Sequence, residues 1–441
     1  MSLIHPTSCP CTKAELDLFT SPPTQVAIDS GHWVEHHPVS SLTDTAPVEF
    51  LVSGTPEYYI DLSNTFLYVK ARVVKLDGRD LDGEDVAAPC NLFLHSLFSQ
   101  LDVHLSNVLV SSSNNTYSYR AFLETFLSSG TDQRSGRLTA ALWYHDTPGK
   151  HNVLEIDPKK DHNMGFLARR RYAALSSSIE MVDRLHGDIF AQDRYLLNSV
   201  DMKIKLSRTK DSFSIMSEQP QYKVNMLAAV LHVRKVKLAP SIISAHEAAL
   251  LSSTVKYPIR RCSVKTLSIA QGITSHTVDN LFLGQLPVRL VLGFVDNRAV
   301  NGECSLNPFA FDHHHLSFLA IYHDGNMVPH RALTPRFATG EGLHTLSFMS
   351  LFTGLGLLDD SQGIPLSISD YSKGYCLYAF DLTPDLAPVG GHFNLMKQGN
   401  IRMEVHFDQP LDETVSVVVY AEFENMIEID KSRSVFVDYA N

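Results

Sequence analysis

Two pairs of strand-like segments, one in each half of the chain, limit its possible folds more than any other feature. In the second pair, apolar and polar residues alternate over residues 398–407, and β-branched residues dominate residues 414–420. The first pair, residues 199–207 and 222–238, has the same character. Alternation with a period of two is typical of a strand with one buried face. We interpret each pair as a long hairpin that ends a β domain.

Further features precede each pair in the same order. Residues 97–112 and 316–331 both have the pattern of a strand, a polar turn and a short strand. Residues 117–130 and 344–356 both predict a short apolar helix. The repeat period of roughly two hundred residues is too long for a solenoid. The sequence therefore predicts two tandem domains of one kind.

The length and composition agree with this division. The 441 residues leave room for two domains of about 200 residues, each large enough for a sizeable core. Hydrophobic residues make up 44% and charged residues 19%, which is typical of a globular protein. Many short strands with few helices predict an all-β chain in which each half is a sandwich or jelly roll of about eight antiparallel strands. The predicted parts are an N-terminal arm (1–43), a first jelly roll (44–238), a linker with a short helix (239–257) and a second jelly roll (258–441).

The charge and the ends of the chain exclude several classes of protein. A net charge of −11 argues against a protein that coats nucleic acid, and we predict no specific nucleic-acid site. We interpret the one basic run, Arg169-Arg170-Arg171, as a solvated loop or strand edge. The sequence contains no run of 18 apolar residues, so we predict no membrane-spanning helix. The N-terminus has no secretory leader pattern, so we expect no secretion and no disulfides among the six cysteines.

Few residues suggest chemistry. His313-His314-His315 is the strongest metal signal, but neighbours on a strand alternate faces, so at most His313 and His315 would share one. Cys9-Pro10-Cys11 lacks the spacing of a zinc knuckle or a redox pair. Acidic pairs such as Asp359-Asp360 are typical of solvated turns. We therefore predict no catalytic, cofactor-binding or metal-binding residue, and no enzymatic activity.

Two segments are candidates for contact between subunits. Residues 130–165 are irregular, contain Trp143, and are predicted to form a long inserted loop. Loops of this length in compact domains are usually functional or interfacial. We expect the N-terminal arm, which contains Trp33, to be extended and to dock on its own domain or on a neighbour, so it is the second candidate. A flexible tail is the alternative interpretation.

Long strings of the sequence resemble the major capsid protein of Polinton (Maverick) virus-like DNA transposons and of the related adintoviruses. The resemblance runs from about Ala14 to Tyr439, nearly the whole chain. The strings are NTFLYVKARVVK, NLFLHSLFSQLDVHL, VSSSNNTYSYRAFLETFLSSG, LTAALWYHDT, AQDRYLLNSVDMKIKLSRTKDSF, KYPIRR, NLFLGQLPVRLVLGFVDN, GYCLYAFDLTPDL, FNLMKQGNIRMEVHF and VYAEFENMIEID.

The resemblance implies a double jelly-roll capsid protein, similar in architecture to adenovirus hexon. It implies a homotrimer that forms a pseudo-hexagonal capsomer and tiles an icosahedral shell around double-stranded DNA. A separate penton protein, a packaging ATPase and a cysteine protease are the implied companions, and the virion is the implied location. Two alternatives stay open: a host-retained copy that serves as a non-enzymatic binding module, and a jelly-roll metalloenzyme or lectin that uses the histidines.

Overall fold

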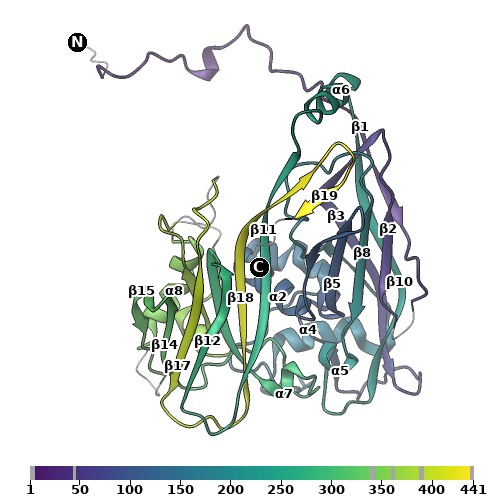
Figure 1. The fold of residues 1–441 in the computed structure, drawn as a ribbon. Helices are drawn as coiled ribbons and strands as arrows, with labels where there is room; N and C mark the ends of the chain where they lie inside the picture. Colours follow the sequence, from purple (N-terminus) through teal and green to yellow (C-terminus); the bar gives the residue numbers. More distant parts are fainter. Residues whose placement is uncertain (1–4, 43–45, 338–342, 359–362, 387–391, 438–441) are drawn as a thin grey trace.

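A computed structural model describes residues 5–42, 46–337, 343–358, 363–386 and 392–437 of the protein. Two β-sandwiches lie side by side, with the first half of the chain on the right of Figure 1 and the second half on the left. We call residues 28–238 roll 1 and residues 255–437 roll 2.

Each roll is built from two facing sheets whose four main strands follow the same order, and in roll 2 the short strand β19 pairs with β18 as a fifth strand of one sheet. Roll 1 has the orders β1-β10-β3-β7 and β2-β8-β5-β6, and roll 2 has β11-β18-β13-β16 and β12-β17-β14-β15. Every pairing within these sheets is antiparallel. This topology confirms the predicted all-β double jelly roll.

The strands of roll 1 are β1 Ile28–His36, β2 Val48–Val52, β3 Tyr58–Lys75, β5 Phe98–Leu105, β6 Val108–Ser112, β7 Ile179–Arg184, β8 Met202–Arg208 and β10 Tyr222–Leu238. Those of roll 2 are β11 Val255–Ile269, β12 Ser275–Gln285, β13 Arg289–Asp296, β14 Leu316–His323, β15 Asn326–Leu333, β16 Leu377–Asp381, β17 Gln398–Phe407 and β18 Val415–Ile429. Three short strands, β4 Ala87–Pro89, β9 Ile215–Ser217 and β19 Val435–Val437, complete the set.

The predicted terminal hairpins are wrong, although their strands are right. β8 and β10 lie in opposite sheets of roll 1, and β17 and β18 lie in opposite sheets of roll 2. The alternation of apolar and polar residues shows that each strand buries one face in the core, but it does not show which strand it pairs with. The polar loop after each first strand therefore crosses from one sheet to the other.

The true hairpins are the two strand-turn-strand features recognised in the sequence. β5 pairs with β6 and β14 pairs with β15. Their two-residue turns, Ser106-Asn107 and Asp324-Gly325, have positive φ at both positions. Such turns match the twist of antiparallel strands. The same device at the same place in both rolls supports the tandem repeat.

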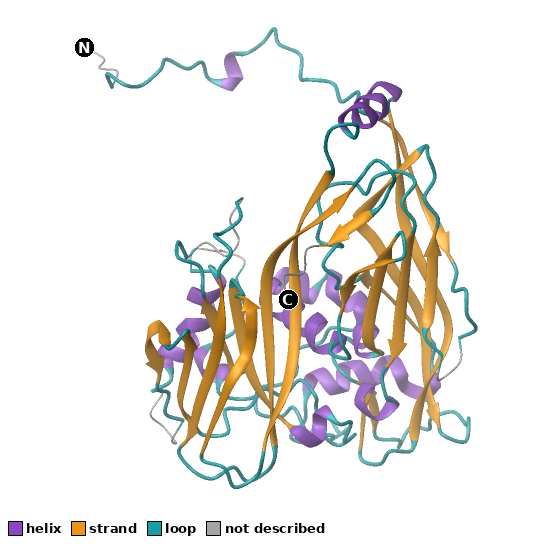
Figure 2. Cartoon of the chain, in the orientation of Figure 1, coloured by secondary structure: helices purple, strands orange, loops and turns teal. Residues whose placement is uncertain are grey.

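The two predicted apolar helices also occupy equivalent places. α2 spans Tyr117–Ser128 and α8 spans Thr345–Leu355, each directly after the hairpin of its roll. The helix predicted between the two halves is α6, Pro240–Ala249, none of whose residues is fully buried. Figure 2 shows several helices in the centre of the molecule, between the strands of the two rolls. The remaining helices are η1 Ala14–Leu16, α1 Phe93–Ser96, α3 Thr131–Ser135, η2 Arg137–Ala141, α4 Met164–Ala173, η3 Ala174–Ser176, α5 Asp211–Ser214, α7 Asn297–Val300 and α9 Ile368–Tyr371.

The segment 130–165 is not the predicted inserted surface loop. It contains α3 and η2 and runs into the start of α4. Trp143 is only 1% exposed and packs against the ring of Phe122, 5.3 Å between centroids. Burial within its own chain removes Trp143 as a candidate contact between subunits. The prediction that the basic run is a solvated loop or strand edge is also wrong. The run lies on α4, and Arg169 is fully buried.

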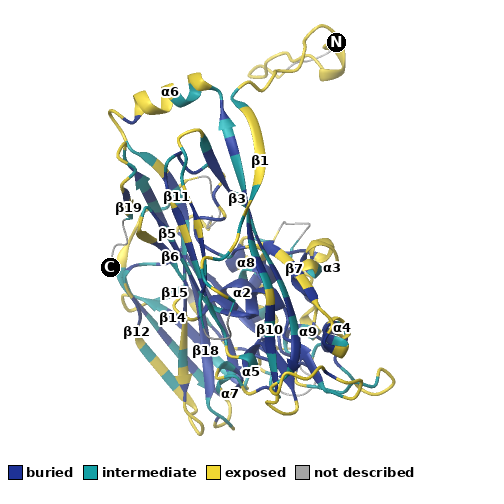
Figure 3. Ribbon diagram, turned by 90° about the vertical axis from the view of Figure 1, so that its right-hand side faces the viewer, coloured by how far each residue is buried: buried dark blue, intermediate teal, exposed yellow. Residues whose placement is uncertain are grey.

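Part of the predicted arm packs on its own roll. Residues 28–36 form β1, which pairs with β10 at the edge of roll 1, so Trp33 belongs to the roll. Residues 5–27 extend away from the body of the molecule near α6 (Figure 1). Figure 3 shows that this stretch is exposed, whereas α2 lies in the buried interior. None of the described helices is long and apolar enough to cross a membrane.

Candidate assembly surfaces and the interface between the rolls

Stacked aromatic rings join the two rolls. Phe122 on α2 stacks on Phe309 of roll 2, with 4.3 Å between ring centroids and 1° between ring planes. Phe126, one turn further along α2, stacks on Tyr375 at 5.5 Å. All four rings are buried in one hydrophobic cluster that spans both rolls. A shared core of this kind fixes the rolls as one rigid unit, because interiors pack at crystal-like density.

A fully buried ion pair reinforces the same interface. Arg169 donates from Nη2 to Oδ1 of Asp146 at 2.8 Å, and both side chains are almost completely buried. Asp146 also reaches roll 2, since its Oδ2 accepts from Asn307 at 3.0 Å and its carbonyl oxygen accepts from the hydroxyl of Tyr375 at 2.7 Å. Burial acts to raise the pKa of Asp146, but the charge of Arg169 outweighs it and the pKa stays below its usual value.

A charged cavity of about 340 Å³ lies at the interface of the rolls. Arg120 on α2 is its central cation and forms ion pairs with Glu124 and Asp188, both at 2.8 Å. Asp188 accepts in turn from the backbone N–H of Cys262 on β11 at 3.0 Å. Burial opposes ionisation of Glu124, yet Arg120 and His186 lower its pKa to about 2. This network couples α2 to the second roll by charge as well as by packing.

Folding should weaken as the pH falls below 6.5, and His95 is one cause. His95 is fully buried, its Nδ1 lies 2.9 Å from the hydroxyl of Tyr117, and burial lowers its pKa to about 4. The unfolded chain therefore takes up this proton first, and the contribution to stability is lost between about pH 6.5 and pH 4. We expect His95 to account for a loss of about 2 kcal/mol between pH 7 and pH 5.

Urea unfolding at these two pH values measures the effect. The His95→Gln variant, which has no group that titrates there, should lose less stability between pH 7 and pH 5 than the unchanged protein. An equal loss in both proteins would contradict the assignment to His95.

The histidine run does not form a strand. It lies in the turn before β14, with positive φ at His314 and His315. The ring of His313 stacks on Phe337 at 4.2 Å, and burial lowers its pKa to about 4. Within the described ranges, no three His, Cys, Asp or Glu side chains are grouped so that they could hold a metal ion.

The other candidates from the sequence are scattered. Cys9 and Cys11 are exposed on the arm, and the remaining four cysteines are buried and free. Asn114-Asn115-Thr116 matches the Asn-x-Thr pattern of a glycosylation sequon and lies at a turn with positive φ at Asn114 and Asn115. The pair Asp359-Asp360 lies outside the described residues.

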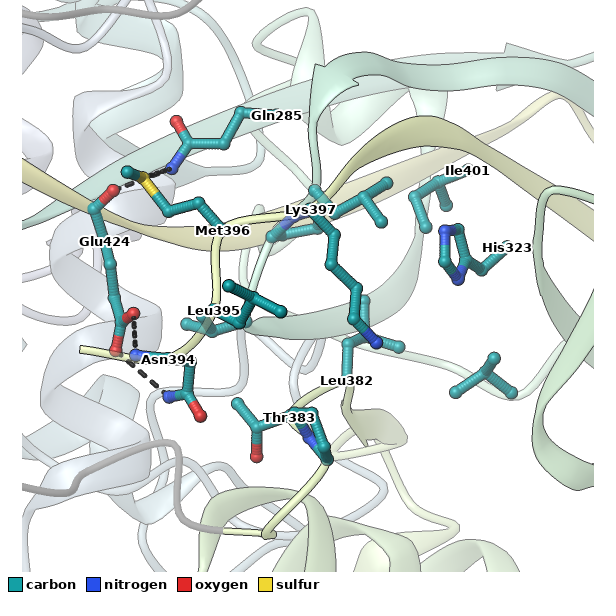
Figure 4. Close-up of a pocket in the computed structure, with 15 residues that line it drawn as sticks. Gln285, His323, Leu382, Thr383, Asn394, Leu395, Met396, Lys397, Ile401 and Glu424 are labelled. Carbon is teal, nitrogen blue, oxygen red and sulfur yellow. Dashed lines mark hydrogen bonds between the residues drawn. The ribbon is translucent and has the colours of Figure 1, made fainter. Parts of the chain in front are cut away.

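Eight large apolar side chains of roll 2 are exposed in the segments around α8 and between β16 and β17. They lie on α8, after β16 and before β17, and comprise Leu343, Leu346, Met349, Leu358, Leu386, Phe393, Leu395 and Met396. Figure 4 shows the groove that Leu395 and Met396 line beside Leu382. Asn394 holds this segment in place, since its backbone and side-chain N–H groups donate to the carboxylate of Glu424 at 2.6 and 3.1 Å.

The two equivalent helices differ in how far they are covered. Ten residues of α2 are buried, because roll 2 packs over the face that roll 1 leaves open. Only four residues of α8 are buried, and Leu346 and Met349 are exposed. α8 lies in roll 2 where α2 lies in roll 1, but neither of the two described rolls covers its outer face. Leu346 and Met349 are three residues apart and so share one face of the helix, and exposed apolar side chains grouped in this way are typical of interaction sites.

Comparison with known structures identifies the architecture. A chain in the cryo-EM structure of the Sputnik virophage superposes with a TM-score of 0.69 at 10% identity, covering 100% of this chain and 94% of that one. The crystal structure of the mavirus major capsid protein gives a TM-score of 0.55 at 10% identity, over 99% of this chain and 97% of that one. The chain has the fold of a viral major capsid protein.

Sequence comparison finds one match that extends over nearly the whole length of both proteins. The chain is 25% identical over 431 residues to an uncharacterized protein of Caenorhabditis elegans, F54H12.2, covering 95% of this chain and 99% of the nematode protein. No protein-family model matches the sequence.

Proposed function

We propose that this chain is a structural, non-enzymatic major capsid protein that forms homotrimers. The supporting observation is the exposed apolar face of α8. In a ring of three copies, roll 1 of the next copy would lie against roll 2 as roll 2 lies against roll 1 within the chain. α8 would then be covered as α2 is, and six similar rolls would alternate around the ring.

A trimer of paired rolls has nearly sixfold outer shape, so one chain can tile a lattice. We propose that such capsomers build an icosahedral shell around double-stranded DNA, with a separate penton protein at the vertices, and that the protein resides in the virion. The Polinton and adintovirus lineage is part of this proposal and rests on the sequence strings that resemble it.

The exposed arm is the proposed link between capsomers. Leu16, Leu18, Phe19 and Val26 are all largely exposed, and Phe19 is 96% exposed. The arm leaves the body at Ala27, whose carbonyl oxygen accepts from the N–H of Ala239. An extended arm of this length spans several tens of Å, at about 3.3 Å per residue. Apolar side chains held this far from their own core are suited to a neighbouring copy.

A second candidate is a host-retained copy that keeps the fold but does not assemble. The full-length match to a nematode protein favours it. The oligomeric state separates the two candidates, since a binding module of this kind would be a stable monomer.

A double variant of α8 tests the trimer contact. Leu346→Glu with Met349→Glu should dissociate the trimer, because it places two charges in the apolar contact, while the β-sheet circular dichroism stays unchanged. Leu283→Glu is the matched control, since Leu283 is exposed on β12 of the same roll. Equal trimer stability in the double variant and the control would remove α8 from the interface.

A further inference from the structure

The outer face of the roll 1 sheet β1-β10-β3-β7 carries apolar side chains that lie outside the core of the roll. On β3, Leu67 and Val69 point into the core and are completely buried, whereas Phe66 and Tyr68 alternate with them and are half-buried on the outer face. Trp33 on the edge strand β1 borders this face, with its ring 5.5 Å from that of Phe66. The outer face is therefore aromatic and apolar, and it stays partly open in the described part of the chain.

One row of this face crosses three strands. Tyr68 on β3 lies opposite Val182 on β7 and opposite Val230 on β10. Side chains directly opposite on neighbouring strands are in contact distance, so the three form one apolar strip. Val182 is 40% exposed, and Tyr68 and Val230 are half-buried. We call these three residues the open row.

Roll 2 has an equivalent row, which roll 1 buries. On the strands that correspond by sheet order, the row consists of Ala379, Val291, Tyr420 and Val264, each opposite the next. All four are at most 8% exposed. Roll 1 reaches this covered row through α2, because the hydroxyl of Thr116 at its N-cap lies 3.3 Å from the carbonyl oxygen of Val264, and Arg120 lines the same cavity as Tyr420. The outer face of this sheet is thus the surface on which a roll receives the helix of its neighbour.

α8 offers a surface that matches the open row. The eleven residues of α8 include no charged side chain, so covering its outer face buries no charge of the helix. Beside the helix lies a cavity of about 610 Å³, lined by Thr353 and Gly354 of α8 and by Leu333, Ala379 and Leu386 around it. A mostly apolar hollow next to an apolar helix can accept side chains that project from a second surface.

α8 and the open row lie too far apart to meet within one chain. α8 is on the left of Figure 1, and β10, which carries Val230, is on the right. Two surfaces on opposite sides of a molecule meet only between copies, in head-to-tail order. Such a contact closes into a ring when the rotation between copies allows it.

We propose that the open row of one copy covers α8 of the next copy, as the covered row of roll 2 receives α2 within the chain. The inference rests on the proposed trimer and names the partner surface of α8. Each copy contributes α8 on one side and the open row on the other, so three equal contacts close the ring.

Thiol cross-linking tests this pairing. In a background with Cys9→Ser and Cys11→Ser, which removes the two exposed cysteines, Leu346→Cys is combined with Val182→Cys. A bifunctional maleimide should then join separate chains, and denaturing gels should show covalent dimers and trimers. The matched control combines Leu346→Cys with Leu51→Cys, since Leu51 is 50% exposed on β2 in the other sheet of roll 1. We expect the control to run as single chains.

A charge in the open row provides a second readout. Val182→Glu should raise the concentration at which the trimer dissociates by at least about tenfold, because the carboxylate would lie against an uncharged helix. Leu346→Lys added to Val182→Glu should recover part of that loss, and Leu51→Glu should leave the trimer unchanged. The β-sheet circular dichroism of each variant shows whether it is folded.

Light scattering on the unchanged protein separates this inference from the proposed trimer. If the protein is a trimer but the Leu346→Cys and Val182→Cys variant gives no more interchain product than its control, the pairing is wrong and the trimer stands. If the protein is a monomer, the trimer and the pairing both fail.

Discussion

Replacing Arg169 by methionine should lower the free energy of unfolding by about 3–5 kcal/mol, because the carboxylate of Asp146 would stay buried without its cation. The loss should include contacts beyond the ion pair. Arg169 also donates to the carbonyl oxygens of Pro89 and Tyr144, both at 2.8 Å, and these acceptors would lose their donor. Urea unfolding followed by circular dichroism measures the change.

Arg171→Met is the matched control, since Arg171 lies on the same helix and is exposed. It should change stability by less than about 0.5 kcal/mol. If Arg169→Met does not fold, the combined Arg169→Met and Asp146→Asn variant should recover part of the loss, because no unpaired charge is then buried. Equal unfolding midpoints for Arg169→Met and Arg171→Met would contradict this account of the interface.

Replacing Trp143 by alanine should cost about 3–5 kcal/mol of folding stability, the range for large aromatic side chains removed from a core. The ring packs on Phe122, and the guanidinium of Arg134 lies 5.6 Å from its centroid. Because Trp143 is enclosed within one chain, the loss should appear in unfolding and not as a weaker contact between copies.

The chain provides its own control in its other tryptophan. Trp33 lies on the edge strand β1 and is 49% exposed, with its ring 5.5 Å from that of Phe66. Trp33→Ala should cost less than about 1 kcal/mol. A larger loss for Trp33→Ala than for Trp143→Ala would contradict the described core.

The sequence predicts strands well where one face is buried, and it predicts their partners poorly. The period of two in residues 398–407 follows from the core on one side of β17. This alternation does not indicate that β14 and β12 are the strands that flank β17 in the sheet. Pairing depends on residues distant in sequence, so the terminal hairpins had no physical basis beyond their proximity along the chain.

The surroundings of the arginine run and of the histidine run are hard to predict from the sequence for a related reason. Three consecutive arginines suggest a solvated segment, but a helix turns about 100° per residue, so one of the three faces inward. Arg169 is that residue, and its partner Asp146 lies on a different segment of roll 1. The sequence predicts a strand for the histidine run, whereas His314 and His315 adopt left-handed backbone conformations in a turn. Local pattern could show neither environment.

The candidate assembly surface could not be predicted from the sequence. The apolar residues of α8 follow the same helical pattern as those of α2, so the pattern predicts that the apolar face of each helix is buried. Only the arrangement of the rolls shows that α2 is covered within the chain and that Leu346 and Met349 are not. Equivalent positions in a tandem repeat therefore become unequal, because roll 2 covers α2 whereas neither roll covers Leu346 and Met349 of α8.

The mass of the purified protein in solution tests the central claim most directly. Light scattering across a dilution series through the micromolar range should give three times the 49.1 kDa of one chain. Obligate interfaces bury more than about 2,000 Å², so the trimer should persist on dilution. A mass of one chain at all concentrations, with native β circular dichroism, would contradict the capsid proposal and favour a monomeric binding module.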